Sequence, residues 1–299
     1  MAVNGILPLY HDAYCPLVPG YPLLRQHLLH LAPRLAGLPE EVKRELEDPN
    51  SRYNIGWSHG KEKLESGKLD LLKGSFYANP ILDIPTTELS LVKRYPSYCG
   101  PNMWPRRALP ELEPAFKALG KLILDVGLLL AHHCDRYGLT CGMFTRDAVE
   151  LPCPDSAAGL YVKTRSGQIV KVVYGEDEIA YQIGETTEIL SRGQLCATPH
   201  CVRAPKGEAA FGVERSTFAL FMQLTGMLIN QLFCILAVTG YLEKPVSILE
   251  TLVNIHWVED EKLIFPELKN IHEFSTPNGS ISFGDYTEKV LDKYYDLEA

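Results

Sequence analysis

EIAYQIGETTEILSRGQLCATPHCVRA occupies residues 178–204, and after a basic loop the chain continues as VERSTF at residues 213–218. In the first part, Ile179, Tyr181 and Ile183 recur at every second position, a period typical of a half-buried strand. Gly184 and Gly193 mark two turns. The region is therefore predicted to consist of short strands joined by turns.

Arg215 and Thr217 stand two positions apart in the mostly apolar stretch that begins at Val213. Side chains at i and i+2 of a strand point to the same face, so a guanidinium and a hydroxyl would be directed at one ligand. A guanidinium binds a carboxylate through two parallel hydrogen bonds. The pair is therefore predicted to hold a small dicarboxylate.

The composition is that of an ordinary globular protein, with 46% hydrophobic and 22% charged residues among 299. The formal net charge of −8 and the lack of a Lys/Arg-rich block argue against nucleic acid or an anionic membrane as a partner. The eight cysteines include no C-x-x-C pair, and no signal peptide is recognised. These features predict a cytoplasmic protein with free thiols.

The N-terminal half is predicted to be mainly helical. Residues 22–48 carry leucines near helical spacing, whereas residues 52–79 are polar and Gly-rich and are predicted to be mainly loop. Prolines recur from Pro80 to Pro110, which disfavours long elements there. A long helix is predicted from about Glu111 to Tyr137, on the apolar stripe Leu112, Phe116, Leu119, Ile123 and Val126.

From Leu139 onwards the pattern favours strands. Residues 159–165 and 168–173 are predicted to form a hairpin with Ser166 and Gly167 in its turn. Helices followed by many short strands predict an α+β chain with a β-barrel core.

Several motifs resemble those of the 2-oxoglutarate/Fe(II)-dependent dioxygenases of the isopenicillin-N-synthase-like superfamily. The matching segments are IGETTEILSRG at 183–193, ATPHCV at 197–202, the Arg-x-Thr of the strand at 213–218, YPSYCGPNMWP at 95–105 and SFGDY at 282–286. The resemblance covers the larger part of the chain.

The resemblance implies an α+β fold with a double-stranded β-helix (jelly-roll) core. Residues 1–137 would form a helical N-terminal region, and residues 138–299 would form the oxygenase-like domain. It further implies Fe(II) and 2-oxoglutarate as cofactors, with His200 as a metal ligand and with Arg215 and Thr217 binding 2-oxoglutarate. The implied reaction is the oxidation of a small molecule, but neither the substrate nor a catalytic residue follows from the motifs.

The front of the iron site departs from the family pattern. Such a site needs two histidines and one carboxylate on one face of the metal, and the family supplies the first two ligands as His-x-Asp on a strand. The literal match, His133-Cys134-Asp135, falls at the end of the predicted helix, where positions i and i+2 lie about 200° apart. These residues are either a charged helix end, favoured there by the helix dipole, or a rebuilt part of the triad.

An apolar segment at about 224–256 is the second departure, since the family lacks it. The chain carries no charge from Ser216 to Leu242, a length that could span a bilayer. Polar residues dilute this run at Gln223, Thr225, Asn230, Gln231 and Thr239. The segment is therefore predicted to fold as an apolar helix or helix pair against the domain, with membrane association possible but not favoured.

Two functions of different class remain open. In the first, the chain is a working oxygenase; in the second, it is a catalytically inactive relative that acts through binding. They differ in whether a second histidine and a carboxylate converge on His200. The oligomeric state is not predicted.

Overall fold

A computed structural model describes residues 18–63, 68–130, 136–145, 149–164, 166–173, 175, 178–184, 197–203, 205, 211–222, 232–239, 255–257, 285, 287, 288, 291 and 292. The helices of the first part of the chain are α1 (Tyr21–Leu29), α2 (Leu31–Ala36), α3 (Glu40–Glu45), the short 3-10 helix η1 (Pro49–Ser51), α4 (Leu89–Arg94), α5 (Pro96–Cys99) and α6 (Leu112–Leu130).

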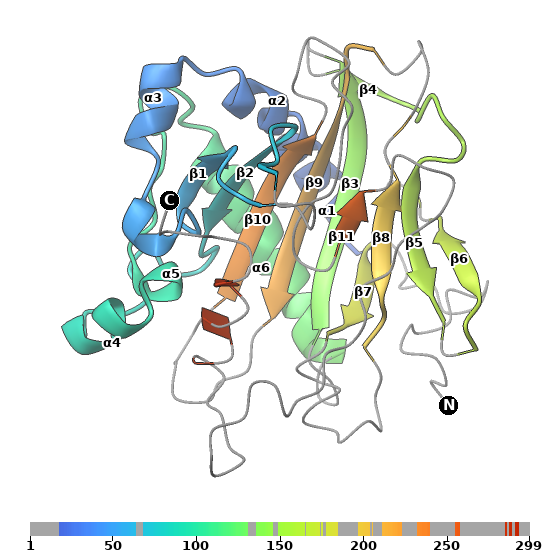
Figure 1. The fold of residues 1–299 in the computed structure, drawn as a ribbon. Coiled ribbons are helices and arrows are strands. Elements are labelled where there is room, and N and C mark those ends of the chain that lie inside the picture. The colour runs from blue at the N-terminus through green and yellow to red at the C-terminus, as the bar shows by residue number, and fades with distance from the viewer. Residues whose placement is uncertain are drawn as a thin grey trace.

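Two sheets accompany these helices (Figure 1). The larger sheet has the order β1–β2–β10–β9–β3–β4, and β7 also pairs with β3; its strands are β1 (Gly56–His59), β2 (Lys73–Ala78), β3 (Arg136–Thr145), β4 (Glu150–Leu151), β7 (Ala180–Ile183), β9 (Val213–Met222) and β10 (Leu232–Thr239). The smaller sheet has the order β11–β8–β5–β6, from β5 (Gly159–Lys163), β6 (Ile169–Val172), β8 (His200–Arg203) and β11 (Ile255–Trp257). The described pairs are antiparallel except β8 with β11. The α+β prediction is confirmed.

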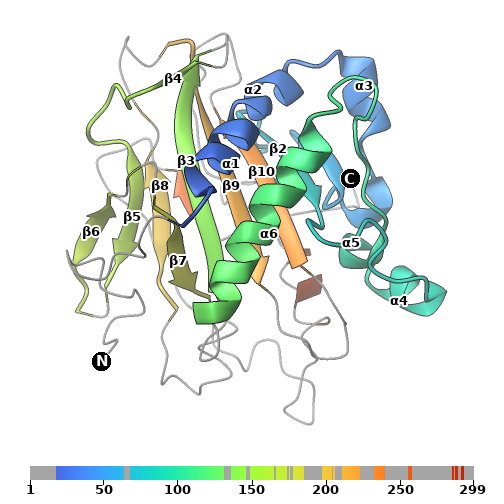
Figure 2. The same cartoon turned by 180° about the vertical axis from the view of Figure 1, so that it is seen from behind.

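The hydrophobic core lies between the helices and one face of the larger sheet. Figure 2 shows α6 and α1 crossing this face. Phe116 of α6 packs edge-on against Phe76 of β2 and Phe218 of β9, with ring centroids 6.0 and 5.0 Å apart. Gly120 allows α6 to pack closely against Pro80, because a Cβ at position 120 would lie only 2.5 Å from the Cβ of Pro80. The sheet therefore has one face covered by helices and one face turned away from α6, which we call the far face.

Asp83 fixes the segment that leads into α6. Its Oδ1 accepts hydrogen bonds from Asn102 Nδ2 at 3.0 Å and Trp104 Nε1 at 2.8 Å, and its Oδ2 accepts one from Lys117 Nζ at 2.7 Å. These donors outweigh the effect of partial burial and lower the pKa of Asp83 to about 2. The Asn-x-Trp-Pro motif at 102–105 thus positions the start of the long helix.

The local patterns at 159–173 and 179–183 predicted their elements correctly. β5 and β6 form the predicted hairpin, and Gly167 in its turn has φ 79°, a left-handed conformation that glycine adopts without strain. β7 occupies the alternating stretch of Tyr181, whose hydroxyl donates to the Ile123 carbonyl of α6 at 3.0 Å.

The prediction that residues 52–79 are mainly loop missed two strands. This stretch contains β1 and β2, and all six residues of β2 are buried. β2 pairs with β1 on one side and with β10, more than 150 positions later, on the other. The polar, Gly-rich stretch therefore contains a hairpin of β1 and β2, and the pairing of β2 with the distant β10 outweighs the local preference for loop.

The end of the predicted long helix was also wrong. α6 ends at Leu130, and Arg136 and Tyr137 already belong to β3. His133 and Asp135 lie between the two elements and outside the described residues.

The apolar segment at 224–256 is not helical where it is described. Residues 232–239 form β10, which lies between β9 and β2. A helix was predicted because it satisfies its own backbone hydrogen bonds. Pairing with β9 and β2 satisfies the backbone N–H and C=O groups of β10 equally well. In the described part of the chain, no helix has the length and apolar character needed to cross a membrane.

Candidate functional site

β9 carries different kinds of side chain on its two faces. Phe218 and Leu220 are buried in the core beneath the helices. Arg215 and Thr217 occupy alternate positions and therefore lie on the far face. The sequence prediction that Arg215 and Thr217 share one face is confirmed by a direct contact, because Arg215 Nη1 donates to Thr217 Oγ1 at 2.7 Å.

The Arg215–Thr217 pair has the chemistry of a carboxylate site. Thr217 is 9% exposed and Arg215 is half-buried, so hydrogen bonds to them are only partly screened by water. The hydrogen bond between them fixes the guanidinium on the strand. A guanidinium held in this way binds a carboxylate at a smaller entropy cost than a free side chain does.

His200 begins β8 in the smaller sheet and is 6% exposed. Its Nδ1 lies 2.8 Å from the carbonyl oxygen of Thr198. A carbonyl only accepts, so Nδ1 must carry the proton, and in the neutral ring Nε2 holds the lone pair. This tautomer suits a metal ligand, because histidine ligands usually donate their second ring N–H to a carbonyl or carboxylate.

Cys201 does not join His200 in a metal site. The two are consecutive on β8, so their side chains point to opposite faces. Burial raises the pKa of the Cys201 thiol to about 11, so it stays protonated at neutral pH. Cys196, the other cysteine flanking His200, lies outside the described residues.

A complete metal centre does not appear among the described residues, where no three His, Cys, Asp or Glu side chains come together to hold an ion. His133 and Asp135 are outside this set. Among the described residues, Arg215 and Thr217 have the chemistry to bind a carboxylate, and His200 has a ring nitrogen of the kind that binds a metal.

Sequence reasoning missed a buried polar network on β2. Glu62 accepts hydrogen bonds from Lys73 Nζ at 2.8 Å and from Tyr77 Oη at 2.6 Å. Lys73 and Tyr77 lie on the far face, because Phe76 and Ala78 between and beyond them belong to the helix-side core. The alternation in KGSFYA at residues 73–78 was the signal that could have revealed this strand.

The chain matches no family model, and a search of curated proteins finds no match. Solved structures do resemble it. A Neurospora crassa protein in complex with alpha-KG and 5-formyluracil is 14% identical, with 74% of this chain and 71% of that chain covered and a TM-score of 0.44. A 2OG-Fe(II) oxygenase family protein from Caulobacter crescentus is 16% identical over 68% of this chain and 73% of that chain, with a TM-score of 0.45.

A third similar structure is JOX2 in complex with 2OG, Fe and JA. It is 12% identical, and the match covers 90% of this chain and 74% of that chain at a TM-score of 0.43. These similar solved structures thus comprise one 2OG-Fe(II) oxygenase family protein and two complexes that hold alpha-KG or 2OG.

Proposed function

We propose that this chain is a 2-oxoglutarate/Fe(II) oxygenase-like protein that binds 2-oxoglutarate through Arg215 and Thr217. The observation that carries the proposal is the 2.7 Å hydrogen bond between these side chains on the far face of β9. It presents a guanidinium and a hydroxyl together, in a partly buried position, to one carboxylate.

The placement of His200 supports the same function. His200 lies in the smaller sheet and the Arg215–Thr217 pair in the larger one. In a double-stranded β-helix the two sheets face each other, and residues from both line the space between them. We assign this architecture to residues 138–299, with β1 and β2 extending its larger sheet.

Each residue then has a defined task. Arg215 binds and neutralises the distal carboxylate of 2-oxoglutarate, and Thr217 orients it through its hydroxyl. Thr198 holds the His200 ring with Nδ1 as the donor, so Nε2 is the nitrogen that would serve as a ligand. A bound iron ion with 2-oxoglutarate would supply oxidising power drawn from molecular oxygen. The partner is a small molecule.

The alternative is a catalytically inactive relative that binds 2-oxoglutarate or another dicarboxylate without oxidising a substrate. One observation favours keeping it. Among the described residues, no His, Cys, Asp or Glu side chains come together with His200 to complete a three-ligand metal site. Both alternatives use the same carboxylate site.

Calorimetry with 2-oxoglutarate tests the proposal. Replacing Arg215 by Leu removes a charge-assisted, bidentate contact worth about 2–3 kcal/mol, so the Kd should rise roughly 30- to 140-fold. The matched control is Arg107→Leu, because Arg107 is exposed and lies before α6, and its Kd should match the wild type. Equal affinity of wild type and Arg215→Leu would refute the assignment.

A further inference from the structure

The register of the larger sheet places a second polar group in line with Thr217. Ser58 of β1 lies opposite Ser75 of β2, Ser75 lies opposite position 237 of β10, and position 237 lies opposite Thr217. Directly opposite residues share a face of a sheet. Ser58 and Ser75 are therefore on the far face with Thr217, and Ser75 is two strand spacings, about 10 Å, from it.

The two serine hydroxyls are buried without a partner. Ser58 is 2% and Ser75 is 1% exposed, and neither Oγ makes a hydrogen bond within the described part of the chain. A buried hydroxyl left unpaired costs stability, because it has given up its hydrogen bonds to water and gained none in return. Such groups are rare in native structures, and a ligand is one reason for them.

The charged groups around the serines already have partners. Glu62 joins Lys73 to Tyr77, the residues on either side of Ser75 along this face. The Lys73 ammonium and the Glu62 carboxylate neutralise each other at 2.8 Å. The groups on this part of the face that lack a hydrogen bond, Ser58 Oγ and Ser75 Oγ, are thus uncharged.

We propose that Ser58 and Ser75 bind the substrate of the proposed oxygenase, through an uncharged carbonyl or amide group of that substrate. Opposed side chains on neighbouring strands have Cβ atoms about 5 Å apart, so one such group can contact both hydroxyls. The substrate would then extend along the row toward the 2-oxoglutarate held by Arg215 and Thr217. The inference rests on the proposed function.

Access requires a local change, because both serines are closed off from solvent. A ligand reaches Ser75 after the Glu62 side chain, which bridges Lys73 and Tyr77 on either side of it, moves aside. The hydrogen bonds then form in a dry site, where they are stronger than at the surface.

Saturation-transfer NMR on the full chain with saturating 2-oxoglutarate tests the inference, with acetamide, succinimide and cyclohexanone as probes. At least one probe should bind the wild type, and Ser58→Ala and Ser75→Ala, singly and together, should weaken it, by about tenfold for the double variant. The control is Ser97→Ala, because Ser97 is equally buried with an unpaired Oγ but lies in α5. Ser97→Ala should leave probe binding unchanged.

Removing an unpaired hydroxyl should preserve or raise the melting temperature of all these variants, so loss of folding does not obscure the result. If no probe binds the wild type, or if a probe binds the double serine variant as well as the wild type, the inference is overturned. Failure of 2-oxoglutarate itself to bind would instead overturn the proposed function.

Discussion

At the scale of the residue, the ring of His200 is fixed in orientation, whereas a metal site also requires other side chains. The Thr198 carbonyl sets its tautomer, and burial restricts its motion. One imidazole does not make a facial triad, which needs a second histidine and a carboxylate. The described residues do not provide these two further ligands.

The first prediction at this scale concerns iron. If His200 is the sole strong ligand, the purified chain should retain no stoichiometric Fe(II) after dialysis, because water would fill most of the coordination sphere. Metal analysis by mass spectrometry measures this. A tight one-to-one complex that is lost in His133→Ala, and kept in the control His30→Ala, would show that the literal His-x-Asp completes the site.

Asp70 gives the second residue-scale prediction. Burial raises the pKa of Asp70 to about 7, against the attraction of Lys73. Between its ordinary pKa of 3.8 and about 7 the folded chain holds a proton that the unfolded chain releases. The free energy of unfolding should therefore fall as the pH rises through this window, by up to about 4 kcal/mol.

Asp70→Asn should remove this dependence, because an amide does not titrate and its oxygen can still accept the Leu72 N–H. Urea unfolding at pH 4, 5.5 and 7.5 measures the difference. The variant should match the wild type near pH 4 and exceed it above pH 7. Parallel curves for the two proteins across this range would contradict the assigned pKa.

At the scale of elements, β10 is the strand that binds the larger sheet together. It connects β9, which carries the candidate carboxylate site, to β2, which carries the Glu62 network. Without β10 the far face would be divided between two separate sets of strands. The alignment of Ser75 with Thr217 depends on its register.

A cross-link tests that register. Cys234 of β10 lies opposite Ala78 of β2, and opposed residues in antiparallel strands have Cα atoms about 4.5–5.5 Å apart, within disulfide range. Ala78→Cys should form a disulfide with Cys234 under mild oxidation, detected by peptide mass spectrometry. The control Ser75→Cys lies opposite position 237 on the other face and should not link to Cys234. A helix at 232–239 would give no such selectivity.

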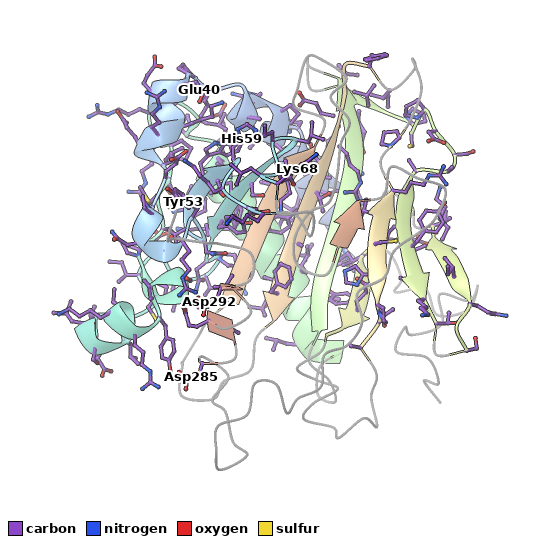
Figure 3. All side chains as sticks on the ribbon, in the orientation of Figure 1. Glu40, Tyr53, His59, Lys68, Asp285 and Asp292 are labelled. Atoms are coloured by element: carbon purple, nitrogen blue, oxygen red, sulfur yellow. The ribbon has the colours of Figure 1, made fainter. Side chains whose placement is uncertain are left out.

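On the scale of the whole molecule, the far C-terminal part is tied to the N-terminal region. Arg52 contacts Glu288 at 3.1 Å and Asp292 at 2.8 Å, and Arg94 contacts Asp285 at 3.1 Å. Figure 3 shows Asp285 and Asp292 beside α4 and α5. Burial raises the pKa of Tyr98, which keeps its hydroxyl protonated for its hydrogen bond with Thr287. Among the described residues, these ion pairs join the C-terminal part to the N-terminal region.

Arg52→Gln should loosen this junction, because it removes both ion pairs and leaves Glu288 half-buried without its cation. Trypsin cleavage after Lys289 should become about tenfold faster, and added salt should narrow the difference by screening the exposed Asp292 pair. The control Lys121→Gln removes an exposed ion pair with Asp125 and should leave cleavage unchanged. Equal rates in Arg52→Gln and wild type would show that the junction does not depend on charge.

The sequence by itself determined the features that rest on local periodicity. The hairpin of β5 and β6, the start of α6 and the shared face of Arg215 and Thr217 all follow from spacings of a few residues, because helix and strand geometry fix where such side chains point. His200 was likewise found from its motif, although its role stays a prediction.

Only the tertiary structure decided the features that rest on distant pairing. β2 and β10 have patterns that predicted loop or helix, and they became strands because they pair with each other more than 150 positions apart. β1, in the same predicted loop, pairs with β2. The alignment of Ser58 and Ser75 with Thr217 exists only through that pairing. Local geometry determines where a side chain points from its own element, whereas the register between distant strands determines which side chains meet.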